Sequence, residues 1–186
     1  MTGKRSDARR NYAHILAVAE AEVAAHGAQA SLEQIARTAG VGSATVRRHF
    51  PSRKALLSAV FEQRVHALCE HAVVLADEDD SRAALVRWLR ELLDYSLAAR
   101  GLADLLSFEP LQEEVTRDSC AADIGAAGAL LLRRAIAERA VRADVTVDDL
   151  LTLIVGIALA TENYTDPATP ADRAFRLAVA GLAATG

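Results

Sequence analysis

Apolar residues recur three or four positions apart along most of the chain, and this spacing constrains the fold more than any other feature. It is the period of an amphipathic helix, because side chains three and four positions apart share one helix face. The composition agrees, since 40 of the 186 residues are Ala and 24 are Leu, both good helix formers, while aromatic residues make up only 4%. The sequence therefore predicts an all-α protein and excludes an all-β sandwich or barrel.

Start and stop signals divide this pattern into separate helices. Capping-box patterns pair Ser31 with Gln34, Thr146 with Asp149, and Thr169 with Asp172. Ser52 stands where it can cap a long helix, and residues 111–120 are compatible with either a helix or a loop. The predicted helices cover about residues 7–26, 31–39, 43–50, 52–76, 81–101, 102–106, 121–140, 147–163 and 170–184.

Charge divides the chain into two parts. The first 54 residues carry nine Lys or Arg and four Asp or Glu, which gives a net charge of +5. The remaining residues carry 12 Lys or Arg and 21 Asp or Glu, which gives a net charge of −9. A basic segment on an acidic body is typical of a small nucleic-acid-binding module joined to a larger domain, although a solvated surface also produces such a split by chance. We therefore predict a DNA-binding domain at residues 1–54 and a second helical domain at residues 55–186.

The helices predicted at 31–39 and 43–50 have the form of a helix-turn-helix. They are short, and the residues between them, Gly40, Val41 and Gly42, suit a tight turn. Val46 and Phe50 are expected to point inward with Val41, which leaves the remaining side chains of the second helix to solvent or to a DNA groove. Those side chains belong to Ser43, Ala44, Thr45, Arg47, Arg48 and His49.

The run SLEQIARTAGVGSATVRRHFPSRKALL, residues 31–57, resembles the DNA-binding signature of the tetracycline repressor (TetR) family of transcriptional regulators. The resemblance covers about residues 8–57. It implies a three-helix DNA-binding module joined by a long helix to a helical bundle that binds a small molecule and dimerises. The implied function is that of a homodimeric repressor that binds a palindromic operator and releases it in response to a ligand.

Three positions depart from the family pattern. Gly42 stands where the family usually has Ser or Thr, so the helix cap is either Gly42 or Ser43. Arg47 replaces a common Tyr that touches phosphate in the family, and Arg can bind either a phosphate or a guanine edge. Arg53 replaces a common Lys at the start of the long helix. The expected DNA contacts are Ser43, Ala44, Thr45, Arg47, Arg48, His49, Arg53 and Lys54, with Arg47, Arg53 and Lys54 at the phosphates.

The body offers weaker signals for a ligand site and a dimer interface. The candidate ligand contacts are His66, Cys69, Trp88, Tyr95 and Phe108, each of which is also compatible with an ordinary core or surface role. The segment 147–163 is apolar nearly all round, more than one face within the chain can cover, so it is expected to form a dimer interface together with 170–184.

Other function classes lack support in the sequence. No catalytic triad order or phosphate-binding loop is present, so we expect no enzyme and no cofactor, and a helical-bundle enzyme would need clustered titratable groups. His66, Cys69, Glu70 and His71 lie within two helical turns, but too few share a face to predict a metal site.

The sequence also bears on location and on the mode of regulation. The longest uncharged stretch has twelve residues, against about 18 for a membrane span, and Glu20 and Glu22 interrupt the Ala-rich N-terminal segment that would otherwise imitate a signal peptide. A cytoplasmic protein is expected. Activation rather than repression, or regulation without a small molecule, stays open as an alternative.

Overall fold

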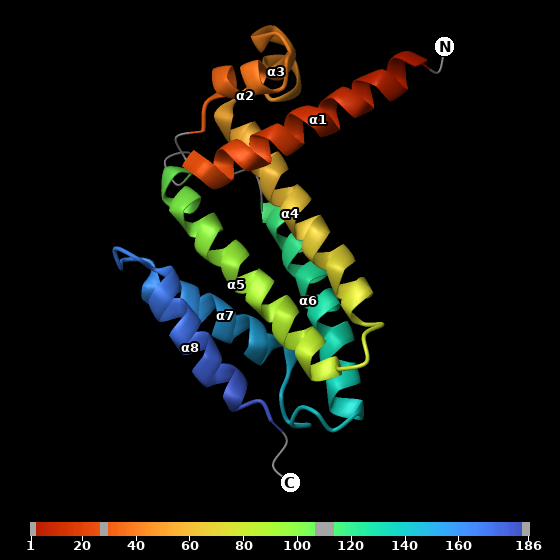
Figure 1. The fold of residues 1–186 in the computed structure, drawn as a ribbon, viewed down its shortest axis with the longest axis vertical. Coiled ribbons are helices and arrows are strands. Elements are labelled where there is room, and N and C mark those ends of the chain that lie inside the picture. Colours follow the sequence, from red (N-terminus) through yellow and green to blue (C-terminus); the bar gives the residue numbers. More distant parts are fainter. Residues whose placement is uncertain (1–2, 27–29, 107–113, 184–186) are drawn as a thin grey trace. The chain divides into compact units, whose positions relative to one another are not determined.

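The computed structural model describes residues 3–26, 30–106 and 114–183, and within these ranges the protein has eight α-helices and no strand (Figure 1). The predicted all-α class is confirmed. The helices are α1 (Gly3–His26), α2 (Leu32–Thr38), α3 (Ser43–His49), α4 (Arg53–Leu75), α5 (Ser81–Leu106), α6 (Glu114–Ala137), α7 (Val147–Thr161) and α8 (Ala168–Ala180).

Several helix starts follow the predicted caps. The hydroxyl of Ser52 accepts a hydrogen bond from the Ala55 backbone N–H at 3.1 Å and so caps α4. At α7 the full capping box is present: the Asp149 N–H donates to Thr146 Oγ1 at 3.1 Å, and the Thr146 N–H donates to the Asp149 carboxylate at 2.9 Å.

The capping box predicted at Thr169 is wrong. Helix α8 begins two residues earlier than expected, at Ala168, after Pro167. Asp166 takes the capping role, because its carboxylate accepts from the Ala168 N–H at 3.1 Å and from the Thr169 hydroxyl at 2.6 Å. Asp172 instead pairs with two arginine side chains.

Two helix boundaries in the middle of the chain also differ from the prediction. The helices predicted at 81–101 and 102–106 are one helix, α5, which continues through Gly101 because a glycine costs a helix interior only about 1 kcal/mol. Helix α6 begins at Glu114, seven residues before the predicted start at 121, so the described part of the ambiguous segment is helical.

The described residues form two compact units. The first contains residues up to 63 together with the end of α5. Its buried core brings together side chains from all of the first four helices, and Leu56, Leu57 and Val60 at the start of α4 belong to it. The core residues are Ile15, Leu16, Ala19, Val23, Ala30, Ile35, Ala36, Ala39, Val46, Phe50, Leu56, Leu57 and Val60.

The second unit contains the rest of α4, most of α5, and α6 to α8. Trp88 is completely buried in its core, and the indole N–H donates to the Leu68 carbonyl oxygen at 3.0 Å. Helices α7 and α8 lie side by side (Figure 1). Leu150, Ile154 and Phe175 are among the buried side chains that these two helices contribute to the core.

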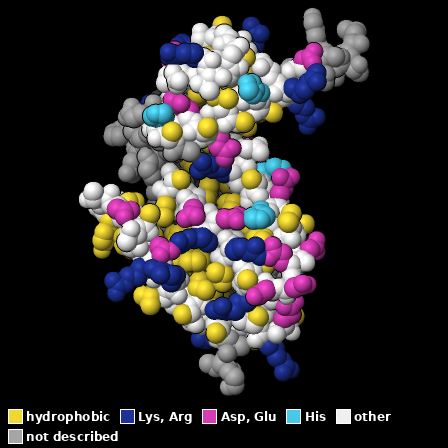
Figure 2. Space-filling model, in the orientation of Figure 1, with side chains coloured by type: hydrophobic (Ala, Val, Ile, Leu, Met, Phe, Trp, Pro, Cys, Tyr) yellow, Lys and Arg dark blue, Asp and Glu magenta, His cyan; other side chains and the backbone are white. Residues whose placement is uncertain are grey.

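Ion pairs cover part of the surface of the second unit. Arg90 on α5 pairs with Asp172 on α8, and its guanidinium lies 5.2 Å from the centre of the Phe175 ring. Arg87 pairs with Glu78. On the face shown in Figure 2, acidic and basic side chains accordingly lie next to one another with apolar side chains between them. A membrane-spanning helix is not found in the described part of the chain.

Candidate nucleic-acid interface and ligand cavity

The turn between α2 and α3 has the predicted helix-turn-helix geometry. Ser31 caps α2, since its hydroxyl accepts from the Gln34 N–H at 3.3 Å. The reciprocal bond of a capping box is replaced by one from the Gln34 amide to Thr38 at 3.4 Å. Gly40 has φ +65°, a left-handed conformation that glycine adopts without strain, and Gly42 is the residue that precedes α3. The alternative cap, Ser43, is the first residue of the helix.

Helix α3 buries one side and exposes the other. Val46 and Phe50 are completely buried and Val41 is half-buried, as predicted. The residues expected to face DNA are exposed at Ser43, Ala44, Arg47 and Arg48, and half-buried at Thr45 and His49. The exposed side of α3 thus carries two small side chains in its first turn and two arginines after them.

His49 is held partly by the first unit itself. Its ring lies edge-on to Tyr12 of α1 with ring centres 5.6 Å apart, and Tyr12 is 5.3 Å from Phe50. These contacts tie the end of α3 to α1 and fix the side of the His49 ring that remains accessible.

Arg47 has an acidic neighbour that was not predicted from the sequence. Its Nη2 donates to Glu33 Oε1 of α2 at 2.8 Å, and both side chains are more than half exposed. The hydrogen bond from Arg47 is the main cause of the lowered pKa of Glu33. Because the two residues are 14 positions apart on different helices, no local spacing rule could have paired them.

The other predicted phosphate contacts lie in the first turn of α4. Arg53 is exposed and Lys54 is half-buried. The Ser52 cap positions both by fixing where α4 starts. Together with α3, this turn gives the first unit a surface with the charge and the small side chains that DNA binding requires.

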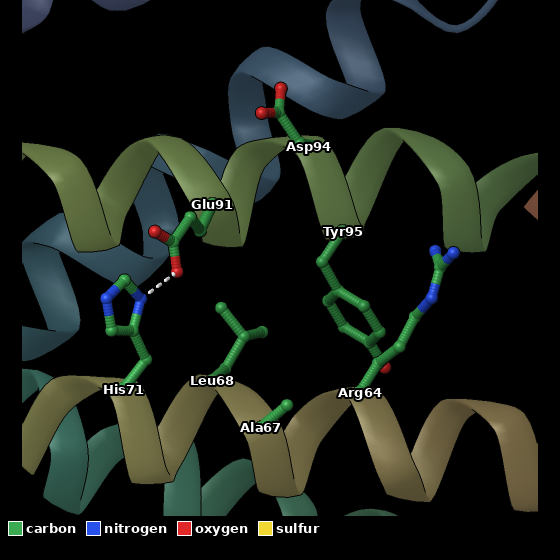
Figure 3. A pocket seen from close by; sticks show the side chains of 7 residues that line it. All are labelled: Arg64, Ala67, Leu68, His71, Glu91, Asp94 and Tyr95. Atoms are coloured by element: carbon green, nitrogen blue, oxygen red, sulfur yellow. Dashed lines mark hydrogen bonds and ion pairs between the residues drawn. The ribbon is translucent and has the colours of Figure 1, made fainter. Parts of the chain in front are cut away.

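A cavity of about 440 Å³ lies within the second unit between α4 and α5 (Figure 3). In Figure 3 the Tyr95 ring of α5 points toward α4 beside Arg64, whereas the Asp94 carboxylate points away from α4. The lining residues are Arg64, Ala67, Leu68 and His71 from α4, and Glu91, Asp94 and Tyr95 from α5.

The polar groups of the cavity are unevenly distributed. His71 Nδ1 lies 2.8 Å from the Glu91 carboxylate and joins the two helices at one end (Figure 3).

Burial raises the pKa of the Tyr95 hydroxyl, which is therefore neutral at ordinary pH. Desolvation also raises the pKa of Asp94, and the nearby Glu91 and Asp172 add to this while Arg90 opposes it. The cavity thus combines the apolar surface of Leu68 and Ala67 with polar groups from both helices.

Of the four predicted ligand contacts that the structure describes, Tyr95 alone lines this cavity. Trp88 belongs to the buried core, and Cys69 is half-buried and packs against that core. His66 is exposed and pairs with Glu70 at 3.2 Å, while Phe108 lies outside the described residues. Among the described residues, no group of three or more potential metal ligands occurs.

Several lining residues were not predicted from the sequence, although their spacing carries a signal. Arg64, Leu68 and His71 recur at intervals of four and three on α4, and Glu91 and Tyr95 are four apart on α5. Each set therefore forms a stripe along one helix face. What the sequence does not show is that these two stripes face each other.

Helices α7 and α8 keep apolar side chains on their outer surfaces. Val155 and Leu159 of α7 are 44% and 47% exposed, and Leu177 of α8 is 71% exposed. Ala178, by contrast, packs partly against the core of its own chain. An exposed apolar surface of this kind is typical of a helical dimer interface.

Family models cover most of the chain. Residues 15–60 match the model for bacterial regulatory proteins of the TetR family, and residues 80–184 match the model for the C-terminal domain of SbtR-like transcriptional regulators. No curated protein matches the chain at a significant level.

Solved structures are similar over nearly the whole length. The TetR transcriptional regulator SCO0520 from Streptomyces coelicolor is 33% identical with a TM-score of 0.75, and 94% of this chain and 99% of that one are covered. A TetR transcription regulatory protein from Mycobacterium vanbaalenii is 35% identical with a TM-score of 0.74, and the match covers 96% of this chain and 98% of that one. The reduced form of Escherichia coli NemR, 17% identical with a TM-score of 0.68 and coverage of 94% and 98%, shares the fold.

Proposed function

The chain belongs to the TetR family of bacterial transcriptional regulators, and from this premise we propose that it is a ligand-responsive homodimeric repressor that binds a palindromic operator. Regulators of this family are DNA-binding proteins and not enzymes. The observation that carries the proposal is the exposed surface of α3 and the start of α4, where small side chains adjoin Arg and Lys. A cytoplasmic location is part of the proposal, since a repressor acts where its operator is.

We assign DNA binding to residues 1–54. The small side chains of Ser43 and Ala44 let the start of α3 approach base edges closely, and Thr45, Arg48 and His49 are the neighbouring groove-facing candidates. Arg47, Arg53 and Lys54 supply positive charge for the phosphates. These side chains are DNA-binding residues in the proposal: Ser43, Ala44, Thr45, Arg47, Arg48, His49, Arg53 and Lys54.

We assign ligand binding and dimerisation to residues 55–186. Two copies of α7 and α8 would form a four-helix interface through the exposed Val155, Leu159 and Leu177. A two-fold dimer presents two recognition helices, which must be about 34–36 Å apart to enter successive major grooves, so the operator is expected to be palindromic.

The cavity between α4 and α5 is the proposed ligand site. Helix α4 begins with Arg53 in the first unit and carries Arg64, Leu68 and His71 of the cavity in the second. A ligand that prefers a different tilt of α4 would change the separation of the two DNA-binding modules. Coupling of a typical 1–3 kcal/mol would weaken operator binding about 5–150-fold.

Selection of bound sequences from a random DNA pool tests the DNA-binding part. The expected result is an inverted repeat whose half-sites are centred about one helical turn apart. A variant with Arg48→Ala should recover a repeat with relaxed preference at one position of each half-site. Recovery of unrelated sequences, or of one unrepeated half-site, would contradict the proposed operator.

Ligand response is tested by reciprocity. Compounds are first identified by a rise in melting temperature that is lost in Ala67→Trp, which fills the cavity, and kept in Ala126→Trp, which places the same side chain on the exposed face of α6. The selected operator must then weaken binding of such a compound by the same factor by which the compound weakens operator binding. Equal affinity for free and operator-bound protein would show that the cavity does not control DNA binding.

A further inference from the structure

The carboxylate of Glu33 contacts both α2 and α3. Its Oε1 accepts the hydrogen bond from Arg47 Nη2 at 2.8 Å, and its Oε2 accepts a longer one, 3.4 Å, from the hydroxyl of Ser31, the cap of α2. Glu33 is thus held at the start of α2 and holds an arginine of α3. The contact joins a residue outside the expected DNA surface to one that belongs to it.

This contact neutralises the charge of Arg47. The hydrogen bond from Arg47 is the largest cause that lowers the pKa of Glu33. A backbone hydrogen bond, the positive charge of Arg47 and the hydrogen bond from the Ser31 hydroxyl lower it further, so the carboxylate is ionised at neutral pH. A guanidinium paired with a carboxylate attracts a phosphate less strongly than a free one does, because a phosphate that approaches it also meets the negative Glu33. Arg47 therefore attracts a phosphate more strongly once it has left Glu33.

The other arginines of the surface are in a different state. Arg48 and Arg53 are exposed and have no ion-pair partner among the residues that the structure describes. Of the three arginines predicted to contact DNA, Arg47 is therefore the one with an ion-pair partner among the described residues. The affinity for DNA of any sequence depends on the number of phosphates that Lys and Arg neutralise. The Glu33–Arg47 pair is expected to lower that number by one.

We infer that Glu33 is a positioning residue that holds Arg47 away from the DNA phosphates and thereby limits the affinity of the protein for DNA of arbitrary sequence. The inference rests on the proposed DNA-binding surface and adds to it a residue outside that surface. Glu33 reduces the positive charge that the protein presents to DNA of any sequence. Discrimination between DNA sequences is then left to the small side chains of α3 and to Arg48 on that helix.

The test measures binding of the full-length protein to a random-sequence duplex of about 30 base pairs over a range of salt concentrations. In Glu33→Gln the released Arg47 should gain about one phosphate, which steepens the slope of log K against log salt by about 0.9 and raises affinity at 0.1 M salt by about eightfold. In an Arg47→Gln background the same Glu33→Gln change should leave the slope as it is, because no guanidinium is there to be released.

The matched control is Glu62→Gln, which removes the same charge from an exposed position of α4 outside the expected DNA surface. It should not steepen the slope. An equal change in slope for Glu33→Gln with and without Arg47, or an effect as large in Glu62→Gln, would show that only the net charge matters. An unchanged or flatter slope in Glu33→Gln would overturn the inference while the DNA-binding proposal survives. A wild-type protein with no salt-dependent binding at all would overturn both.

Discussion

At the scale of single residues, Gly128 of α6 leaves little space beside the buried Trp88 ring. A Cβ added at Gly128 would be 3.0 Å from two atoms of the Trp88 ring and 3.0 Å from the Val147 side chain. Real side chains do not approach buried neighbours this closely without a shift of one of them. Since Trp88 is completely buried and its indole is fixed by the Leu68 carbonyl, it has little room to move.

We therefore expect Gly128→Ala to lower the free energy of unfolding by about 1–3 kcal/mol, the usual cost of overpacking. Gly125 on the same helix is the control, because no described atom lies within 4 Å of the position that its Cβ would take. Gly125→Ala should raise stability by up to about 1 kcal/mol through helix propensity alone. Urea unfolding measures both, and equal effects of the two substitutions would mean that Trp88 does not limit the space at Gly128.

Arg53 provides the simplest residue-scale test of the DNA surface. It is exposed in the first turn of α4, and no ion-pair partner is found for it in the described part of the chain. Arg53→Ala should weaken binding to all DNA sequences alike and flatten the slope of log K against log salt by about one unit. Arg133→Ala, which removes an exposed arginine from α6, is the control. A loss of affinity confined to one operator position would instead indicate a base contact.

At the scale of secondary-structure elements, local signals predicted most helix starts and missed the features that depend on partners. Thr146 and Asp149 form the expected capping box. At Thr169 the same pattern fails because Asp166 supplies a competing cap earlier in the chain and arginines from α5 and α8 occupy Asp172. The continuous α5 was missed because a glycine inside a helix costs only about 1 kcal/mol and so does not have to end it.

The capping box of α7 gives stability a pH dependence of known sign. Hydrogen bonds from the side chain and the backbone of Thr146 lower the pKa of Asp149 below its ordinary value of 3.8. Because the pKa is lower in the folded state, the carboxylate stabilises the protein fully above the ordinary value, and this contribution is lost as the pH falls through the lowered one. Urea unfolding should show Asp149→Asn less stable than wild type at pH 6, with a smaller difference at pH 3.

The comparison variant is Asp148→Asn, since Asp148 is exposed in the same turn and lies outside the box. It should keep a nearly constant difference from wild type over the same pH range. A pH dependence that is the same in both variants would assign the effect to the net charge of the first turn and not to the box.

The candidate sites differ in how much of them the sequence could predict. The DNA surface depends on spacing within about 25 residues, so the turn, the inward Val46 and Phe50 and the exposed Arg48 all followed from local rules. The cavity depends on which faces of α4 and α5 meet, and only Tyr95 was anticipated. The Glu33 contact likewise depends on the angle between two short helices, which no periodicity encodes.

At the scale of the whole molecule, dimerisation is the property that the surface of the second unit predicts most directly. Leu177 is the most exposed of the large apolar side chains on α8, whereas Ala178 is partly used by the chain's own core. A charge at Leu177 should therefore break an interface without disturbing the fold, since the side chain has few contacts within its own chain.

Leu177→Glu should shift the protein from a dimer to a monomer in light scattering at micromolar concentration, with an unchanged helical circular dichroism spectrum. Val74→Glu places the same charge on an apolar side chain of α4 that is 62% exposed and outside the proposed interface, and it should leave the dimer intact. A Leu177→Glu protein that stays dimeric, or a wild type that is already monomeric, would exclude α8 as the interface.

The start of α4 has a consequence for how such proteins can be recombined. The residues proposed to read DNA end at Lys54, but the core that holds them in place takes Leu56, Leu57 and Val60 from the following turns of α4. A hybrid regulator joined at residue 54 would combine the DNA-binding residues of one protein with core residues from another protein at positions 56, 57 and 60. Relatives can therefore exchange operator preference by recombination only at junctions beyond Val60. Such an exchange also transfers the first turns of α4, the helix through which the ligand is proposed to act.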